Sequence, residues 1–346
     1  MKKNSLAVLA LCLAVMMLAV GCGTKIKGLG GNPMGMYTDV LTDLFELWDD
    51  NGVSTDKAIG DSDKPVKTLE EMQKGGYNVG VLPSNYLTWA RTRKGGMTGT
   101  ANTATANAGA LYSVYLHIIV RDDGQINSLE DLRDKRLVLN VGETGGFFHA
   151  KNVLKAAGIN VDSGSSFRGK IQRSSYLDGM IRLGDNEADA VLTVADIGDQ
   201  AIEQYLYDEE CPLKLLPIDS ATQAEIQRLS DAADIFYTPL TVQNVGGYED
   251  RAPVDMVVIK VALLVNTSVT NDTVRKMLEA IFDEENLAAL KAGNPLFADL
   301  SLQYAVTGMD LRDLHPGALQ FYVEKGVIPE GSVEIYSYLQ ATAAPG

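Results

Sequence analysis

Strand-like and helix-like segments alternate along most of this chain, and this alternation restricts it to an α/β fold. Residues 77–82, 136–141 and 188–194 have the apolar, β-branched composition of short buried strands. Residues 33–49 instead carry apolar side chains at helical spacing, and residues 254–265 are expected to form a long buried strand. Strands that alternate with helices in this way build a sheet covered by helices.

The length of the chain indicates two lobes. A single hydrophobic core rarely serves more than about 250–300 residues, and the chain has 346, of which 46% are hydrophobic. Residues 95–110 are rich in Gly, Ala, Thr and Asn, and they are predicted to form a loop.

The charge balance excludes one group of partners. Asp and Glu number 45 against 30 Lys and Arg, which gives a formal net charge of -15. This acidity argues against nucleic acid or an anionic lipid surface as a partner. It leaves an anionic small ligand open, because the N-termini of helices supply local positive potential.

The N-terminal segment indicates where the protein works. Lys2 and Lys3 precede an apolar run over residues 6–20, which is too short for a membrane span and suits a signal peptide. Leu18-Ala19-Val20-Gly21-Cys22 resembles a bacterial lipobox, in which the cysteine is acylated and becomes the first residue. We expect a signal peptide over residues 1–21 and a periplasmic or extracytoplasmic domain attached to the membrane only through a lipid on Cys22. The alternative is an ordinary signal peptide followed by a chance cysteine.

Too few cysteines remain after processing to form an intramolecular disulfide. Cys12 would leave with the signal peptide and Cys22 would carry the lipid, so that Cys211 alone remains. One thiol forms neither an intramolecular disulfide nor a cysteine metal site. We expect no metal and no cofactor.

Two glycine-rich loops, each between a predicted strand and a predicted helix, are candidates for ligand contact. They cover residues 28–37 and 140–148. Glycines let the backbone approach a ligand closely, and the free amides at a helix start attract anions. Two such loops facing each other across a cleft would hold a small carboxylate. The alternative is that these turns serve packing only.

Nucleotide-binding and catalytic motifs are missing from the sequence. A dinucleotide fingerprint that started at Gly28 would need glycine where Pro33 stands, and neither loop ends in Gly-Lys-Ser/Thr. There is no Gly-x-Ser-x-Gly and no His-Glu-x-x-His. The three histidines, His117, His149 and His315, lack metal-ligand spacing, and each is interpreted as structural. We therefore expect no catalytic residues.

The segment Leu314-His315-Pro316-Gly317-Ala318-Leu319 opens a capped amphipathic helix that ends near Gly326. Residues 314–326 also resemble the C-terminal signature of the TAXI-type receptors of tripartite ATP-independent periplasmic (TRAP) transporters. Further landmarks of that family follow in the same order along the chain: the loop ending in Tyr37, residues 111–132, residues 135–146, residues 150–158, residues 187–190 and Gly247-Tyr248.

This resemblance implies a two-lobe fold of the periplasmic-binding-protein type, type II-like, with a hinge of crossover strands. Lobe I would comprise residues 22–116 plus 250–346, and lobe II residues 117–249. Residues 117–120 would cross out and residues 255–265 would return. The implied function is that of a monomeric extracytoplasmic receptor, which captures a small organic solute and delivers it to a membrane permease.

Ligands of the family are small carboxylates such as glutamate or C4–C5 dicarboxylates. The residues that match its binding positions are Gly31, Asn32, Met34, Tyr37, Ser84, Asn85, Gly142, Glu143, Thr144, Gly145, Gly146, Phe147, Phe148, Asp196 and Tyr248. Thr144, Gly145, Ser84 and Asn85 would donate hydrogen bonds, and Tyr37, Phe147 and Tyr248 would form an aromatic wall. Asp196 would accept an amine from the ligand or cap a helix starting near Ile197, and the cap is the preferred interpretation.

The second loop departs from the family pattern at Glu143. A carboxylate there would repel an acidic ligand if it pointed into the cleft. Either Glu143 faces solvent, or the ligand is cationic, zwitterionic or more apolar than usual. No arginine is clearly placed to clamp a carboxylate, although Arg121, Arg168, Arg173 and Arg251 are candidates. Two other function classes remain open, which are a periplasmic sensor or interaction lipoprotein without a transporter and an enzyme that uses the same cleft.

Overall fold

The computed structural model describes residues 25–31, 36–62, 65–93, 102–140, 145–231, 241–248 and 251–331. One ten-stranded sheet passes through these residues in the order β2-β1-β3-β10-β4-β7-β5-β6, with β8 paired to β4 and β9 to β10. The strands are β1 (Ile26–Leu29), β2 (Thr55–Gly60), β3 (Val79–Pro83), β4 (Thr105–Arg121), β5 (Arg136–Leu139), β6 (Lys170–Arg173), β7 (Ala190–Ala195), β8 (Leu213–Leu215), β9 (Thr241–Val245) and β10 (Val254–Asn266).

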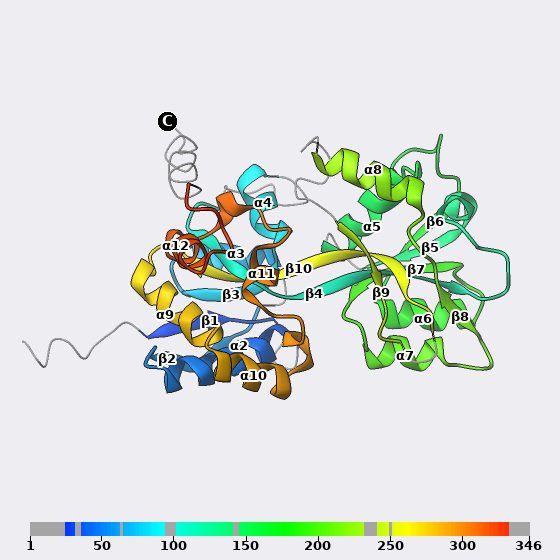
Figure 1. Ribbon diagram of the computed structural model, residues 1–346. Helices are drawn as coiled ribbons and strands as arrows, with labels where there is room; N and C mark the ends of the chain where they lie inside the picture. Colours follow the sequence, from blue (N-terminus) through cyan, green and yellow to red (C-terminus); the bar gives the residue numbers. More distant parts are fainter. Residues whose placement is uncertain are drawn as a thin grey trace, which may run out of the picture.

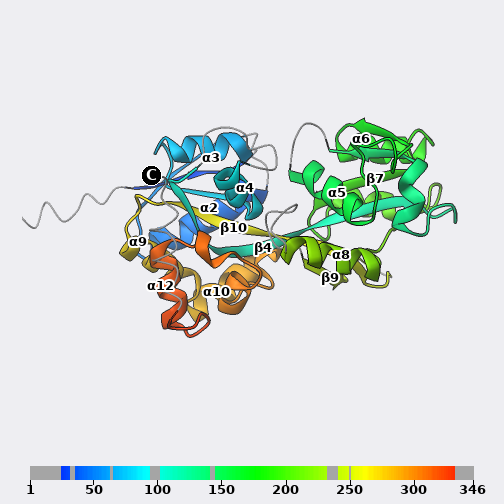
Figure 2. The ribbon, with the colours of Figure 1, turned by 90° about the horizontal axis from the view of Figure 1, so that it is seen from above.

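Figures 1 and 2 show two lobes joined by β4 and β10. The two strands pair antiparallel from Thr105 opposite Asn266 to Leu116 opposite Val257. In lobe I, β10 also pairs with β3, whereas in lobe II β4 pairs with β7 and β8 and β10 pairs with β9. Both strands are therefore hydrogen-bonded in both lobes, as the predicted two-lobe α/β fold with crossover strands requires. The residue boundaries predicted for the lobes stay a prediction.

Helices cover both faces of the sheet. The helices of lobe I are α2 (Met36–Asp50), α3 (Pro65–Gln73), α4 (Asn85–Thr92), α9 (Asn271–Ile281), α10 (Glu284–Gly293), α11 (Leu302–Val306) and α12 (Pro316–Glu324), with the 3-10 turns η2 (Pro295–Phe297) and η3 (Leu311–Asp313). Those of lobe II are α5 (Gly145–Ala156), α6 (Tyr176–Gly184), α7 (Gln200–Leu206) and α8 (Ser220–Asp231), with the 3-10 helix η1 (Leu129–Asp134). No helix among these combines the length and apolarity needed to cross a bilayer.

The two faces of the sheet belong to different packing clusters. In lobe I, α3 and α4 pack on one face and α2, α9 and α12 on the other. In lobe II, α5 and α8 lie on one face and α6 and α7 on the other. The predicted helical face of α2 is buried, and the indole of Trp48 donates to the backbone oxygen of Met277 at 3.1 Å.

The loop predicted over residues 95–110 is wrong from Thr105 onward, because β4 begins there. Ala106, Ala108 and Ala110 are buried in this part of the strand. Small side chains lack the strong apolar signal of a strand, but they let helices approach the sheet closely. The hydroxyl of Tyr322 on α12, for example, donates to the backbone oxygen of Ala108 at 2.9 Å.

The C-terminal segment that carries the family resemblance has a structural role. His315 is buried at the N-cap of α12, where its Nδ1 accepts from the amide of Gly317 at 3.1 Å. Its Nε2 lies 3.1 Å from the backbone oxygen of Val269 and donates to it. The structural interpretation of His315 is therefore confirmed, because both ring nitrogens are occupied within the protein.

Gly317 generates a testable prediction, because a Cβ there would lie 2.6 Å from the backbone oxygen of Asn271. We expect Gly317→Ala to push α12 from α9 and to lower the free energy of unfolding by about 1–3 kcal/mol. The matched control is Gly293→Ala at the end of α10, where the added Cβ meets nothing within 4 Å. Urea denaturation of both variants tests this, and unchanged stability of Gly317→Ala would contradict the close contact.

Candidate ligand-binding cleft

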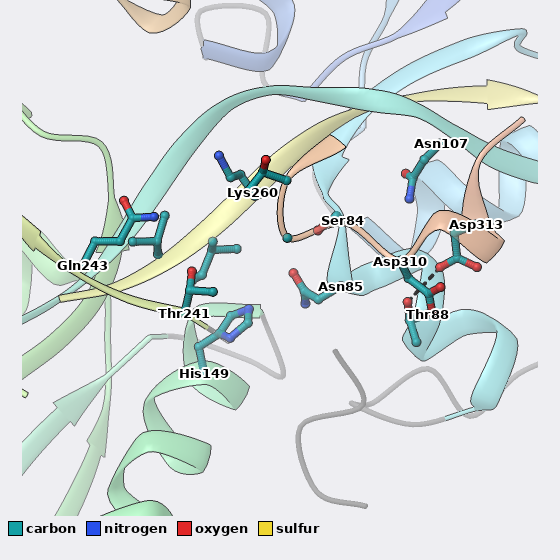
Figure 3. A pocket seen from close by; sticks show the side chains of 14 residues that line it. Ser84, Asn85, Thr88, Asn107, His149, Thr241, Gln243, Lys260, Asp310 and Asp313 are labelled. Atoms are coloured by element: carbon teal, nitrogen blue, oxygen red, sulfur yellow. Dashed lines mark hydrogen bonds between the residues drawn. The ribbon is translucent and has the colours of Figure 1, made fainter. Parts of the chain in front are cut away.

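An open cleft runs along the edge of β10 between the two lobes (Figure 3). About 50 Å³ of it can hold the centres of water-sized molecules, and its space with open solvent included is about 600 Å³. Ser84, Asn85, Thr88 and Asn107 line it from lobe I, His149, Thr241 and Gln243 line it from lobe II, and Lys260 of β10 lies between them. The cleft lies where neither strand flanks β10, because β3 pairs with Val261–Val265 and β9 pairs with Val254–Val258.

Three buried side chains in this cleft have no hydrogen-bond partner among the described residues. Asn85, Asn107 and His149 are 2%, 1% and 2% exposed. Both amide atoms of each asparagine and both ring nitrogens of His149 lack a partner. Figure 3 shows Asn85 and His149 facing each other from opposite lobes. An unmet buried polar group costs about 1–3 kcal/mol, so the cleft has polar groups suited to an incoming ligand.

Two other buried asparagines of lobe I, in contrast, have partners for both amide atoms. The amide nitrogen of Asn102 donates to the Leu69 backbone oxygen at 2.8 Å, and its oxygen accepts from the Ala104 amide at 3.1 Å. The nitrogen of Asn266 donates to the Met72 backbone oxygen at 2.6 Å, and its oxygen accepts from Ser268. The unmet amides are thus not a general property of the buried asparagines.

Lys260 supplies the positive charge of the cleft. Its Nζ lies 3.1 Å from the ring centroid of Tyr304. Burial lowers the pKa of Lys260 to about 8, and the nearby Asp299 opposes this shift. Among the described residues no carboxylate forms an ion pair with this ammonium group. At neutral pH most Lys260 side chains remain protonated, so the ammonium group can attract a carboxylate.

The two carboxylates of the lining are already paired. Asp313 accepts from the hydroxyl of Thr88 at 2.9 Å and forms an ion pair with Arg91. Asp310 forms an ion pair with Arg312 at 2.6 Å. These contacts leave Lys260 as the charged lining residue that has no ion-pair partner among the described residues.

Aromatic side chains join the two lobes beside the cleft. Trp89 of α4 lies with its ring centroid 5.4 Å from that of His149 and 5.7 Å from that of Phe148, both on α5. The ring centroid of Tyr86, also on α4, lies 5.4 Å from that of Trp89. Burial lowers the pKa of His149 to about 3. The imidazole is therefore neutral near pH 7, with one N–H donor and one acceptor nitrogen.

Several predicted site residues lie at this interface. Ser84 and Asn85 line the cleft, while Gly145 and Gly146 begin α5. Phe147 is buried, and the guanidinium of Arg173 lies 3.5 Å from its ring centroid. Contact of these residues with a ligand stays a prediction. The other predicted residues Asn32, Met34, Gly142, Glu143 and Thr144, together with Cys22, lie outside the described residues.

A second convergence of the predicted residues occurs around Tyr112 on β4. Its hydroxyl is buried and has no hydrogen-bond partner in the described part of the chain. Tyr37 from lobe I and Asp196 from lobe II both lie within electrostatic range of this hydroxyl, and burial is the main cause of its strongly raised pKa. Gly31 lies against Tyr37, since a Cβ on it would meet the Tyr37 ring at 3.3 Å. Tyr37 of α2 and Asp196, which follows β7, therefore approach the same point of β4 from the two lobes.

The cap interpretation of Asp196 is wrong. Helix α7 begins at Gln200, and Asp199 caps it by accepting from the amides of Ala201 and Ile202 at 3.0 Å each. The chain turns first at Gly198, whose φ of 84° delays the helix start. Burial raises the pKa of Asp196, with a further rise from Asp199. Its alternative role as an acceptor for a ligand amine stays a prediction.

Tyr248 and three of the candidate arginines have partners away from the cleft. The hydroxyl of Tyr248 lies 2.6 Å from Nε2 of His117, whose Nδ1 contacts the Tyr115 backbone oxygen at 3.0 Å. This confirms His117 as structural, and burial lowers its pKa to about 4. Arg121 pairs with Asp189, Arg168 pairs with Asp134, and Arg251 donates to the Leu206 backbone oxygen.

Sequence reasoning missed Asn107, His149, Thr241, Gln243 and Lys260. Of these residues, only Lys260 could have been identified from the sequence. A lysine within a strand of mostly buried residues rarely serves packing, which makes it a candidate functional residue. The sequence predicts a structural role for His149, because the histidines lack metal-ligand spacing. Its unpartnered nitrogens separate it from His117 and His315, and only the folded structure shows this.

Comparison with known proteins finds one sequence family and several solved structures that are similar to this chain. A sequence model described as the NMT1-like family matches residues 34–326. The structure of XAC2383 from Xanthomonas citri bound to ATP is similar at 12% identity and a TM-score of 0.50, covering 93% of this chain and 100% of that one. A probable amino-acid ABC transporter extracellular-binding protein, ytmK from Bacillus subtilis, is similar at 15% identity and a TM-score of 0.46, with 80% and 99% covered. A TctC solute binding protein from Polaromonas shows 16% identity and a TM-score of 0.48, with 78% and 88% covered.

The unmet amides of the cleft generate a prediction about stability. Asn107→Leu removes two buried polar atoms without partners, so we expect the free energy of unfolding of the ligand-free protein to rise by roughly 1–2 kcal/mol. The control is Asn266→Leu, which breaks existing hydrogen bonds and should lower this free energy by about 1–3 kcal/mol. Chemical denaturation measures both, and equal destabilisation by the two substitutions would contradict the assignment.

Proposed function

The chain belongs to the NMT1-like family, and we propose that it is the extracytoplasmic solute-binding receptor of a TRAP transporter. It captures a small organic solute, a carboxylate or amino acid, and delivers it to the membrane permease. The receptor works as a monomer held to the membrane by a lipid on Cys22, after removal of residues 1–21. Lobe I comprises residues 22–116 plus 250–346, and lobe II comprises residues 117–249.

The observation that carries this proposal is the set of unpartnered polar atoms on both sides of the cleft. Asn85 and Asn107 belong to lobe I and His149 to lobe II. A solute with polar groups meets all of them at once only while the lobes are closed. Solute binding therefore favours the closed state, since a ligand shifts a conformational equilibrium by its difference in affinity for the two states.

The hinge is suited to this movement. Because β4 and β10 are paired in both lobes, the lobes stay connected by continuous strands while their relative orientation changes. Closure by rotation about a few connecting segments is a common mode of ligand capture. The closed state would present a surface of both lobes to the permease, which distinguishes a loaded receptor from an empty one. The proposal involves binding and release of the solute and no chemical step.

A thermal-shift screen of residues 23–346 tests the proposal. The screen contains amino acids, hydroxy acids, dicarboxylates, 2-oxoacids and simple amines. A ligand that binds only the folded state raises the melting temperature. At a ligand concentration one hundred times its dissociation constant, the free energy of unfolding rises by about 2.7 kcal/mol. We expect at least one of these solutes to give such a shift.

Three variants locate the binding site in the same screen. Asn85→Ala and His149→Ala should reduce the shift, because each removes polar groups that meet the solute. The control is Arg168→Ala, which breaks only an exposed ion pair with Asp134, and it should keep the full shift. Absence of any shift in the wild-type protein would contradict a receptor for these solutes, and a full shift in His149→Ala would contradict this cleft as the site.

A further inference from the structure

The unmet polar atoms of the cleft include both donors and acceptors. Asn85 and Asn107 each present an amide nitrogen, which donates, and an amide oxygen, which accepts. The neutral ring of His149 adds one N–H donor and one acceptor nitrogen. The cleft therefore offers three donor groups and three acceptor atoms from the same three side chains.

This balance distinguishes between solutes that are otherwise alike. A dicarboxylate at neutral pH carries only acceptor oxygens, so it can satisfy the two amide nitrogens and the imidazole N–H. It leaves the oxygens of Asn85 and Asn107 and one nitrogen of His149 without a donor. A binding site with buried hydrogen-bonding groups discriminates strongly against analogues that leave those groups unpaired.

The charges of the cleft agree with this distinction. Lys260 provides one cationic group without an ion-pair partner in the described part of the chain. Asp310 and Asp313 are already paired with Arg312 and Arg91. The ammonium group of Lys260 can pair with one carboxylate of the solute. A second carboxylate would have no cationic partner among the described lining residues.

We propose that the cleft selects a small monocarboxylate that also carries hydroxyl, amide or ammonium donors, such as an amino acid or a hydroxy acid. Lys260 binds the carboxylate, and the oxygens of Asn85 and Asn107 and one nitrogen of His149 accept from the solute. The inference rests on the proposed function, because it takes this cleft to be the solute site. It names Asn107, His149 and Lys260 as residues that determine specificity.

Matched pairs of solutes test the role of the donors. Isothermal titration of residues 23–346 with propionate and L-lactate, and with succinate and L-malate, compares solutes of equal charge that differ by one hydroxyl group. Glutarate and L-glutamine form a third pair, in which one carboxylate is exchanged for an amide and an ammonium group is added. We expect the donor-bearing member of each pair to bind at least about tenfold more tightly, because one unmet buried acceptor is removed.

Two variants separate donor recognition from charge. Asn107→Leu removes an acceptor, so the ratio of the two affinities in each equal-charge pair should move toward one. Lys260→Met removes the cation, so both members should weaken by the same factor and their ratio should stay unchanged. If Asn107→Leu does not fold, Asn85→Ala provides the same comparison, and the melting temperature of each variant reports on folding.

The possible outcomes separate this inference from the proposed function. Equal or tighter binding of propionate, succinate and glutarate would overturn the inference and leave a solute receptor of a different specificity. A ratio that is unchanged in both asparagine variants would also overturn it. Failure of all six solutes to bind would overturn the inference together with the proposed capture of small carboxylates and amino acids.

Discussion

The antiparallel pairing of β4 with β10 is the constraint on which the rest of the structure depends. These two strands contribute to the hydrogen-bonded sheet of each lobe, so their pairing holds the two lobes next to each other. The same pairing places Asn107 and Tyr112 on one strand and Lys260 on the other at the level of the cleft. A strand buried in both lobes consists almost entirely of apolar residues, and its polar exceptions therefore mark positions with a particular role.

The polar exceptions on these strands are of two kinds. His117 is satisfied within the protein by Tyr248 and the backbone of Tyr115. Asn107 and the hydroxyl of Tyr112 remain unmet, although each lies in a buried position. The first kind stabilises the fold. The second kind costs stability in the ligand-free protein, and under the proposed function a solute in the cleft would offset that cost at Asn107.

Much of the fold could be predicted from the sequence because its signals are local. The buried face of α2, the strands β3, β5, β7 and β10, and the capped start of α12 follow from periodicity and from residues within one or two turns. The first part of β4 could not be predicted in this way. Its residues Ala106, Ala108 and Ala110 pack through small size, and small size leaves no period-two pattern of large apolar residues.

The site was predictable only in part, for a physical reason. Ser84 and Asn85 follow a strand end, and strand ends carry binding residues in α/β folds, so position alone nominates them. Asn107 and Asn266 are both buried asparagines on long strands, and nothing in the sequence separates them. They differ in what surrounds their amides after folding. Met72 and Ser268 form hydrogen bonds with the amide of Asn266, whereas no described residue does so with the amide of Asn107. His149 is likewise defined by its contact with Trp89 across the two lobes.

The central claim is that the solute forms hydrogen bonds with the unpartnered polar groups of the cleft. The signals of the three histidines test this claim most directly. NMR of the ¹⁵N-labelled imidazoles, with and without the solute that most stabilises the domain, reports on each ring nitrogen separately. The account predicts that the His149 signals shift on saturation, whereas those of His117 and His315 stay in place because their partners lie within the protein. Unchanged His149 signals in the saturated protein would contradict the assignment of this cleft as the binding site.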